Sequence, residues 1–230
     1  MLIVGALRRQ DPAIHVLFST AADGHRGLSF LRIVKRRHLP LIEPIRPVKR
    51  NTVPVGKGWL YELKLDGFRG VLSIENGRGS FTSKTSKPMP RFQELADALA
   101  RALPAKSAIL DGEIVVMSGQ GPDFYALMFH RGQPAYAAFD LLYLDGRDLR
   151  ELPLWRRKRM LRKLIANTPI AYVEHVEDPA LYAAAAARDL EGIVAKRRGD
   201  PYGSATEWVK VKHPGYSQME GRWELFDKRR

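Results

Sequence analysis

Apolar and polar residues alternate along residues 59–84, a period that is typical of half-buried β-strands. The segments WLYELKL, FRGVLSIE and GSFTSK therefore predict three successive strands separated by glycine-containing turns. In the first strand, Lys64 shares one face with Glu62 and Asp66, and apolar side chains occupy the other face. We expect Asp66-Gly67 to form a tight hairpin turn, because glycine adopts positive φ at little cost.

Lys64 allows two interpretations from this stretch alone. A lysine near the end of an apolar strand is most simply an edge-strand charge that prevents association with other sheets. A chemical role is the alternative, and the rest of the chain has to distinguish the two.

The remaining pattern does not alternate strands and helices regularly. Apolar spacing, flanking prolines and an Asp-Pro start predict three helices, over residues 90–104, 152–167 and 178–190. Further strands are predicted over residues 107–118, 135–146, 169–177, 191–198 and 206–213. We expect a break or bulge at Asp111-Gly112. Because several strands are consecutive, the order indicates an α+β fold with mostly antiparallel sheets, not a doubly wound parallel sheet.

The N-terminal part of the chain is less informative. IHVLFSTAA is compatible with a short strand, and LSFLRIVKRRH with a basic helix or strand. Residues 39–58 hold four prolines and are expected to form an extended lead-in. Residues 1–50 hold ten Lys and Arg against three Asp and Glu, so the N-terminal region is strongly basic.

The amino-acid composition favours some kinds of partner and excludes some kinds of site. The 230 residues include 38 Lys and Arg against 25 Asp and Glu, and this charge of +13 favours a polyanionic partner such as nucleic acid. The absence of cysteine excludes disulfides, thiolate catalysis and zinc–cysteine sites. No apolar run approaches the length of a membrane span and no signal peptide is evident, so we expect a cytoplasmic protein without a membrane partner.

Charged residues recur in pairs on the predicted strands. The pairs are Glu62 with Lys64, Asp111 with Glu113, Glu191 with Lys196, and Lys210 with Lys212. Any one pair fits a solvated sheet face, but together they suit a nucleoside triphosphate and a divalent metal. The chain has no GxxxxGK[ST] and no GxGxxG, so phosphates would have to be held by side chains.

Five ordered motifs extend this interpretation. KLDGFR at 64–69 resembles the K-x-D-G-x-R signature of covalent nucleotidyltransferases, and LDGEIVV, FDLLYLDG, EGIVAK and WVKVK follow in the order seen in ATP-dependent DNA ligases. FDLLYLDGRDLRELPLWRRKRML and WVKVKHPGYSQMEGRWELF are similar to the ligase module of bacterial end-joining ligases. The resemblance covers roughly residues 39–226. It implies a covalent nucleotidyltransferase (ATP-grasp-like) fold, α+β, with mostly antiparallel sheets flanked by helices.

The resemblance also implies roles for individual residues around the nucleotide. Lys64 would be the nucleophile that takes AMP from ATP as a phosphoramide. Glu62 would lie near the adenine amino group, Phe139 would stack on the base, and Glu113 would bind the ribose. Arg69 would approach the nucleotide or the nick phosphate. Phe139 as an ordinary core residue remains the alternative.

Among the residues expected at the phosphates and the metal, some match the family's motifs and others depart from them. Glu191 would help hold Mg²⁺ or Mn²⁺, and Lys210 and Lys212 would neutralise the triphosphate. Lys84 stands where the family has an arginine, so the charge is kept but the bidentate fork is lost. Ser204 stands where many ligases have another arginine.

The expected activity follows from these assignments. AMP would pass to a DNA 5′-phosphate, and a 3′-hydroxyl would displace it to seal nicked or broken DNA during repair or recombination. We expect an unassigned basic extension over residues 1–38, an adenylation domain over 39–216 and a short tail over 217–230. Because no OB-fold domain fits after Lys212, self-adenylation and ligation are expected to be weak unless a partner supplies that clamp.

Two other hypotheses remain open at this stage. One is an RNA ligase or capping-type nucleotidyltransferase, and the other is a non-catalytic nucleic-acid-binding remnant of a ligase. The basic run WRRKRMLRKL at 155–164 fits either a solvated surface or a contact with phosphates. Nucleoid association is expected if the source is bacterial.

Overall fold

The computed structural model describes residues 14–15, 34–35, 39–119 and 121–219, and the chain divides into two units, Met1–Pro40 and Leu41–Arg230. In the first unit, β1 (Ile14–His15) pairs antiparallel with β2 (Val34–Lys35). The rest of the secondary structure expected before residue 39 lies outside the described residues. All further elements belong to the second unit.

A six-stranded sheet, in the order β11-β10-β7-β5-β6 with β12 beside β10, forms the larger half of the second unit. Its strands are β5 (Phe68–Glu75), β6 (Arg78–Ser83), β7 (Ser107–Val115), β10 (Ala135–Leu144), β11 (Arg147–Asp148) and β12 (Ala171–Tyr172). All pairings are antiparallel except β10 with β12.

A five-stranded sheet, in the order β13-β4-β14-β15-β3, forms the other half. Its strands are β3 (Val48–Lys49), β4 (Trp59–Leu63), β13 (His175–Val176), β14 (Gly192–Arg197) and β15 (Val209–Lys212). Only β15 with β3 is parallel. A separate hairpin joins β8 (Met117–Ser118) to β9 (Gly121–Pro122).

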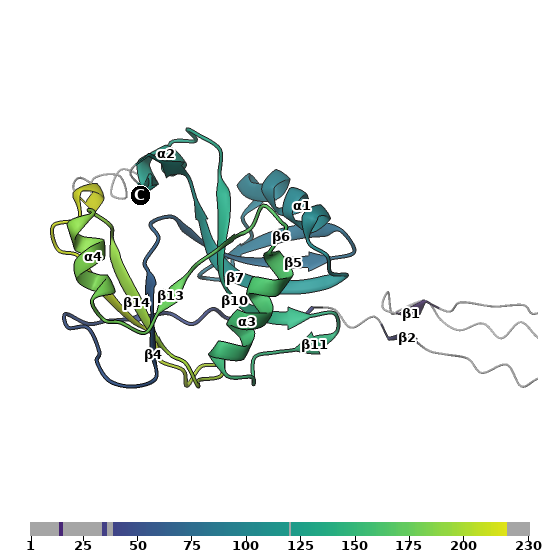
Figure 1. Cartoon of the computed structure of the whole chain (residues 1–230). Helices are drawn as coiled ribbons and strands as arrows, with labels where there is room; N and C mark the ends of the chain where they lie inside the picture. The colour runs from purple at the N-terminus through teal and green to yellow at the C-terminus, as the bar shows by residue number, and fades with distance from the viewer. Residues whose placement is uncertain (1–13, 16–33, 36–38, 120, 220–230) are drawn as a thin grey trace, which may run out of the picture. The chain divides into compact units, whose positions relative to one another are not determined.

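Helices flank both sheets (Figure 1). They are η1 (Pro90–Phe92), α1 (Gln93–Ala102), α2 (Phe124–Met128), α3 (Leu154–Ile165), α4 (Leu181–Ala187) and η2 (Ser217–Met219). The larger apolar core lies between the six-stranded sheet and α1 and α3, and a second core joins α4 to the five-stranded sheet. The predicted α+β class with mostly antiparallel sheets is confirmed. Across the described residues, no helix has the length and apolar character needed to cross a membrane.

Two expectations around Lys64 are wrong. Strand β4 lies between β13 and β14, so Lys64 does not follow an edge strand. Strands β4 and β5 belong to different sheets, so Asp66-Gly67 is a crossing between sheets and not a hairpin turn. Gly67 has no positive φ; it is needed because a Cβ there would lie 2.1 Å from the Ile114 carbonyl oxygen.

The strands also differ from the sequence prediction at two points. Strand β7 runs unbroken through Asp111, and the irregularities fall on its neighbour β10. The register of β10 passes from Ala138 to Asp140 and skips Phe139, and it shifts again between Leu141 and Tyr143. The single strand expected over residues 169–177 is two short ones, β12 and β13, which join different sheets. This segment therefore connects the two sheets.

The cations of α3 do not form one solvated face. Arg157 and Lys158 are 0% and 1% exposed and point into the fold, whereas Arg156 and Arg159 are exposed. The interpretation of the 155–164 run as a wholly surface feature is therefore wrong for its two central cations. Periodicity could not reveal this, because a buried cation needs a buried acid from another part of the chain.

Candidate active site

A cavity of about 710 Å³ is lined by residues of both sheets of the second unit. All nine residues predicted for the site line it. They are Glu62 in β4, Lys64 after β4, Arg69 in β5, Lys84 after β6, Glu113 in β7, Phe139 in β10, Glu191 before β14, and Lys210 and Lys212 in β15. The structure therefore brings together every residue that the motifs singled out.

Lys64 is held at the end of β4 beside a buried acid. Its backbone N–H donates to the Gly192 carbonyl at 2.9 Å, and its Nζ lies 2.5 Å from Glu191 Oε2. Lys212 Nζ lies 2.9 Å from the other Glu191 oxygen. Burial acts to raise the pKa of Glu191, but the two lysines outweigh it and hold that pKa below its usual value. The carboxylate therefore stays ionised between two ammonium groups.

Gly192 fixes the approach of Glu191 to the lysines. Its φ is +132°, and a Cβ there would lie 2.1 Å from the Val211 carbonyl oxygen. Only glycine fits both conditions, so the backbone of β14 can approach β15 closely just after Glu191. The glycine of EGIVAK is therefore a geometric requirement of the site.

The lysines of the cavity outnumber its nearby acids. Lys210 forms no ion pair with any residue in the described part of the chain. Partial burial lowers the pKa of Lys210, and the charges of Lys64, Lys212 and Lys84 lower it further. An anionic ligand would relieve the repulsion among these clustered cations.

Arg69 is restrained more than the motif alone suggests. Its guanidinium makes two 2.6 Å hydrogen bonds to Asp111, and it lies 4.6 Å from the centre of the Phe139 ring. The hydroxyl of Tyr202 donates to the same Asp111 at 2.7 Å. Burial acts to lower the pKa of Arg69, but Asp111 outweighs it and raises that pKa. Asp111 is therefore the anchor of Arg69, not a bulge residue.

Glu113 is the least compensated acid of the cavity. Burial raises its pKa to about 7, although Lys64 and Arg69 act in the opposite direction. Near neutral pH its carboxyl is therefore present in both protonation states and can donate or accept a hydrogen bond.

A buried charge cluster surrounds Glu62. Lys158 Nζ lies 2.5 Å from Glu62 Oε1, Lys196 Nζ lies 2.6 Å from Oε2, and all three side chains are at most 2% exposed. Burial acts to raise the pKa of Glu62, but the two lysines outweigh it and lower that pKa. Burial also lowers the pKa of Lys196 to about 8, partly offset by Glu62.

Lys196 combines deep burial with poor hydrogen bonding. Its Nζ has no partner of hydrogen-bond geometry in the described residues, and it lies 4.2 Å and 4.0 Å from the ring centres of Phe139 and Trp208. Lys196 and Trp208 line the cavity, and Lys158 borders it through Glu62. None of the three was given a role of its own from the sequence, although Lys196 was noted with Glu191 among the charged pairs. Lys196 stands inside EGIVAK and could have been found there, but nothing local distinguishes Lys158 from its neighbours.

Asp66 is buried at the edge of the same site. It accepts a hydrogen bond of 2.9 Å from the hydroxyl of Tyr216, far along the chain. Asp66 therefore connects the segment just after Lys64 to Tyr216, which follows β15. It is more than a turn residue.

The metal assignment rests on few ligands. In the part of the chain that the structure describes, no group of three or more His, Asp or Glu side chains could hold a metal ion. Magnesium, however, commonly uses one or two carboxylates together with substrate phosphates. Glu191 and the nearby Glu113 fit that donor set, and the metal role of Glu191 stays a prediction.

Comparisons with known proteins agree with the geometry. The family model described as ATP dependent DNA ligase domain matches residues 41–212. The multifunctional non-homologous end joining protein LigD of Pseudomonas aeruginosa is 36% identical over 189 residues, which is 75% of this chain and 22% of that protein. The SPbeta prophage-derived DNA ligase-like protein LigB of Bacillus subtilis is 33% identical over 177 residues, 71% of this chain and 64% of that protein.

A solved structure extends the likeness to three dimensions. The structure described as mycobacterial DNA ligase D complexed with ATP and MES has a TM-score of 0.58 and 32% identity, covering 67% of this chain and 54% of that one. The nucleotidyltransferase fold that the motifs imply is thereby confirmed. The matched part of the chain spans 22% of the LigD proteins it resembles. With the family match over most of its length, the chain belongs to the ATP-dependent DNA ligase domain family.

Proposed function

We propose that this chain is the catalytic core of an ATP-dependent DNA ligase, in which Lys64 carries AMP from ATP to a DNA 5′-phosphate before nick sealing. The observation that carries the proposal is the single cavity in which Lys64 meets all eight other motif residues. Membership of the ligase family supports the same conclusion. An RNA ligase or a capping-type enzyme has no observation in its favour beyond the shared fold.

The first step forms a bond between Lys64 and the nucleotide. The Nζ lone pair attacks the α-phosphate of ATP, a P–N bond forms, and pyrophosphate leaves with the electrons of the broken P–O bond. Lys64 must lose a proton before it attacks, and the Glu191 carboxylate, whose Oε2 lies 2.5 Å from the Lys64 Nζ, would hold the amine at the cavity. Lys210 and Lys212 would offset the charge that builds on the phosphates.

The base would bind beside Glu62 and Lys196. The Glu62 carboxylate accepts hydrogen bonds and the Lys196 ammonium donates them, so the pair complements the amino group and the ring nitrogen of adenine. Guanine presents the opposite order, an acceptor oxygen and a ring N–H, and would be disfavoured. Phe139 offers an aromatic face to the ring, and Glu113 a carboxyl to the ribose.

The triphosphate would bind at the lysine cluster. Lys84 and Lys210, which form no ion pair with the described residues, and Lys212, which is paired with Glu191, would contact phosphate oxygens. Glu191 would contribute to a magnesium site completed by those oxygens. A bound divalent ion would supply charge neutralisation there. Arg69 would act near the nucleotide while Asp111 holds its side chain.

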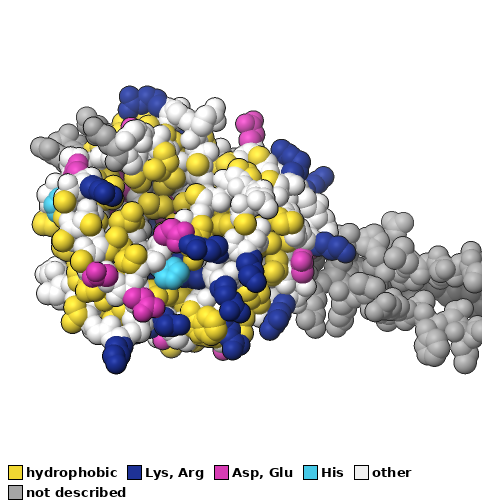
Figure 2. Space-filling view, in the orientation of Figure 1, with side chains coloured by type: hydrophobic (Ala, Val, Ile, Leu, Met, Phe, Trp, Pro, Cys, Tyr) yellow, Lys and Arg dark blue, Asp and Glu magenta, His cyan; other side chains and the backbone are white. Residues whose placement is uncertain are grey.

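DNA would contact the basic surface of the second unit. Figure 2 shows Lys and Arg side chains gathered over the face that carries α3. Arg156, Arg159 and Lys163 are exposed on that helix and form no ion pair with the described residues. We assign them to phosphate contacts, and we place the activity in cytoplasmic DNA repair or recombination. A partner that supplies an OB-fold would be expected to raise both self-adenylation and sealing.

Covalent labelling tests the proposal. The protein is incubated with α-labelled ATP and magnesium, denatured and assayed for protein-bound label. We expect label on the wild-type chain, none on Lys64→Ala, and unchanged label on the exposed control Lys106→Ala. Absence of label on the wild type, also in the presence of nicked DNA, would favour the non-catalytic remnant. Preferential labelling by GTP would favour a capping-type activity.

A further inference from the structure

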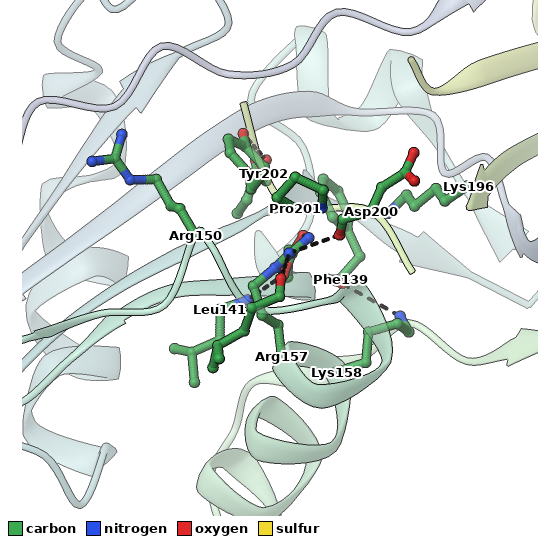
Figure 3. Close-up of polar contacts among 12 residues, drawn as sticks. Phe139, Leu141, Arg150, Arg157, Lys158, Lys196, Asp200, Pro201 and Tyr202 are labelled. Atoms are coloured by element: carbon green, nitrogen blue, oxygen red, sulfur yellow. Dashed lines mark hydrogen bonds and ion pairs between the residues drawn. The ribbon is translucent and has the colours of Figure 1, made fainter. Parts of the chain in front are cut away.

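Lys158 is a buried cation of α3 that donates three hydrogen bonds to the wall of the cavity, and its Nζ also lies 4.8 Å from the centre of the Tyr172 ring. Its Nζ contacts Glu62 Oε1 at 2.5 Å, the Val173 carbonyl at 3.1 Å and the Phe139 carbonyl at 3.3 Å. Figure 3 shows the contact between Lys158 and Phe139. Glu62, Val173 and Phe139 each line the cavity, although Lys158 itself does not. One ammonium group therefore fixes three separate pieces of the binding site.

The two carbonyl groups lie where the sheets are irregular. Phe139 is the residue that the register of β10 with β7 skips, and Val173 lies where the chain passes from β12 to β13. Buried carbonyls at such points lack the partners that a regular ladder provides. Lys158 supplies the missing donor at both points, so the position of the Phe139 ring depends on it.

The carboxylate of Glu62 has two unequal neighbours. Lys158 hydrogen-bonds one oxygen, whereas Lys196 lies 2.6 Å from the other without hydrogen-bond geometry. Lys158 therefore fixes one oxygen of the carboxylate by a hydrogen bond, and the ion pair with Lys196 holds the other. Without Lys158, the Glu62 carboxylate would be free to rotate toward Lys196.

We propose that Lys158 is a positioning residue that sets the preference of the cavity for adenine, by holding Glu62 and the bulge at Phe139 in register with the base. The proposal rests on the proposed function, because it assigns the cavity to ATP. Lys158 does not touch the nucleotide; it acts through two residues that do. The chemical step at Lys64 would depend on it much less than nucleotide binding does.

The neighbouring residue provides a matched control. Arg157 is equally buried, lies on the same helix and makes two hydrogen bonds to Asp140, at 2.8 Å and 2.9 Å. Its other acceptors are the carbonyls of Leu152 and Asp200. None of its partners lines the cavity. Loss of Arg157 should therefore weaken the fold without altering base selection.

The experiment is single-turnover self-adenylation of Lys158→Met and Arg157→Met across a range of ATP and GTP concentrations. For Lys158→Met we expect the half-saturating ATP concentration to rise about tenfold, equivalent to about 1.4 kcal/mol. The preference for ATP over GTP should fall by about the same factor, and the limiting rate should change much less. Arg157→Met should keep the half-saturating concentration and the preference of the wild type, even where its melting temperature is lower.

Two further variants keep the test decisive if Lys158→Met does not fold. Lys158→Arg retains a buried cation and should restore part of the ATP preference. The double variant Glu62→Gln with Lys158→Met should show no further loss of preference beyond Glu62→Gln alone, because the two residues act as a unit.

The outcomes separate the two levels of the proposal. A wild-type chain that takes no AMP from ATP overturns the proposed function and this inference with it. A wild-type chain that labels normally, together with Lys158 variants of unchanged half-saturation and unchanged ATP preference, overturns the role of Lys158 alone. Equal effects of Lys158→Met and Arg157→Met on the preference would also overturn it, since they would reflect a general loss of stability.

Discussion

Replacing Arg157 by methionine should destabilise the fold strongly. The Arg157 and Asp140 side chains are both 0% exposed, and two hydrogen bonds of 2.8 Å and 2.9 Å join them. Methionine would fill part of the space but leave the Asp140 carboxylate buried without its charge partner. The Leu141 backbone N–H, at 2.9 Å, would remain as one donor to it. The helix α3 would then be held on β10 by apolar contacts and by the hydrogen bond from Lys158 to the Phe139 carbonyl.

The magnitude follows from the burial of the pair. Removing one partner of a buried ion pair costs about 3–5 kcal/mol, because the remaining charge has no compensation. For a domain of this size, each kcal/mol lowers the melting temperature by about 2–4 °C, so the expected decrease is about 6–20 °C. Calorimetry and urea unfolding measure it. Arg159→Met, an exposed change on the same helix, should stay within about 0.5 kcal/mol of the wild type.

A double variant identifies the cause. Asp140→Leu with Arg157→Met removes both charges and should recover much of the loss, since apolar replacement of a buried pair is often close to neutral. A loss below about 1 kcal/mol for Arg157→Met would refute the reasoning, because a buried pair cannot be broken so cheaply. Strict additivity of the two single losses in the double variant would refute it as well.

Three further results are expected. Burial raises the pKa of Glu113 to about 7 from its ordinary value of 4.5, so the folded chain keeps a proton that the unfolded chain releases, and stability falls as pH rises through this window. In urea unfolding, the free energy of unfolding of Glu113→Gln relative to that of the wild type should therefore increase as the pH rises from 4.5 to about 7. A difference that does not change with pH would contradict this. Gly67→Ala should destabilise by about 1–3 kcal/mol through its 2.1 Å contact, whereas Gly199→Ala, with open space around it, should be near neutral in the same unfolding assay. Arg159→Gln should reduce the salt-dependence slope of DNA binding by about one, and Arg78→Gln should not; equal slopes would remove α3 from the DNA surface.

The sequence predicts local structure well where one face of an element is buried. The strands around Tyr61, Leu72 and Leu141 follow their apolar patterns, and the helix over residues 90–104 appears as η1 and α1. Periodicity reports burial directly, so these elements needed no knowledge of their partners.

Pairing between distant segments could not be predicted in this way. The Asp66-Gly67 turn signal is the same for a hairpin as for a crossing between sheets, and only the close approach of Ile114 distinguishes them. The bulge was expected at Asp111 because glycine follows it, but the extra residue, Phe139, lies on the neighbouring strand. A bulge belongs to a pair of strands, and one strand's sequence does not say which carries it.

The site shows the same division. All nine residues that the motifs located line the cavity, because each motif is local. The buried lysines around Glu62 were not assigned, since a cation in the run at 155–164 is distinguished from its neighbours only by the acid it meets in the fold. Long-range charge pairing therefore decides which cations of α3 serve the site and which face solvent.

Mass mapping of the adenylated peptide tests the central claim most directly. The chain is incubated with ATP and magnesium, denatured, digested and analysed for peptides that carry one AMP. The account predicts a single adduct on Lys64, labile in acid as a phosphoramide is, and its loss in Lys64→Ala. An adduct on another lysine of the cavity, such as Lys196 or Lys210, or a label that persists in Lys64→Ala, would contradict it.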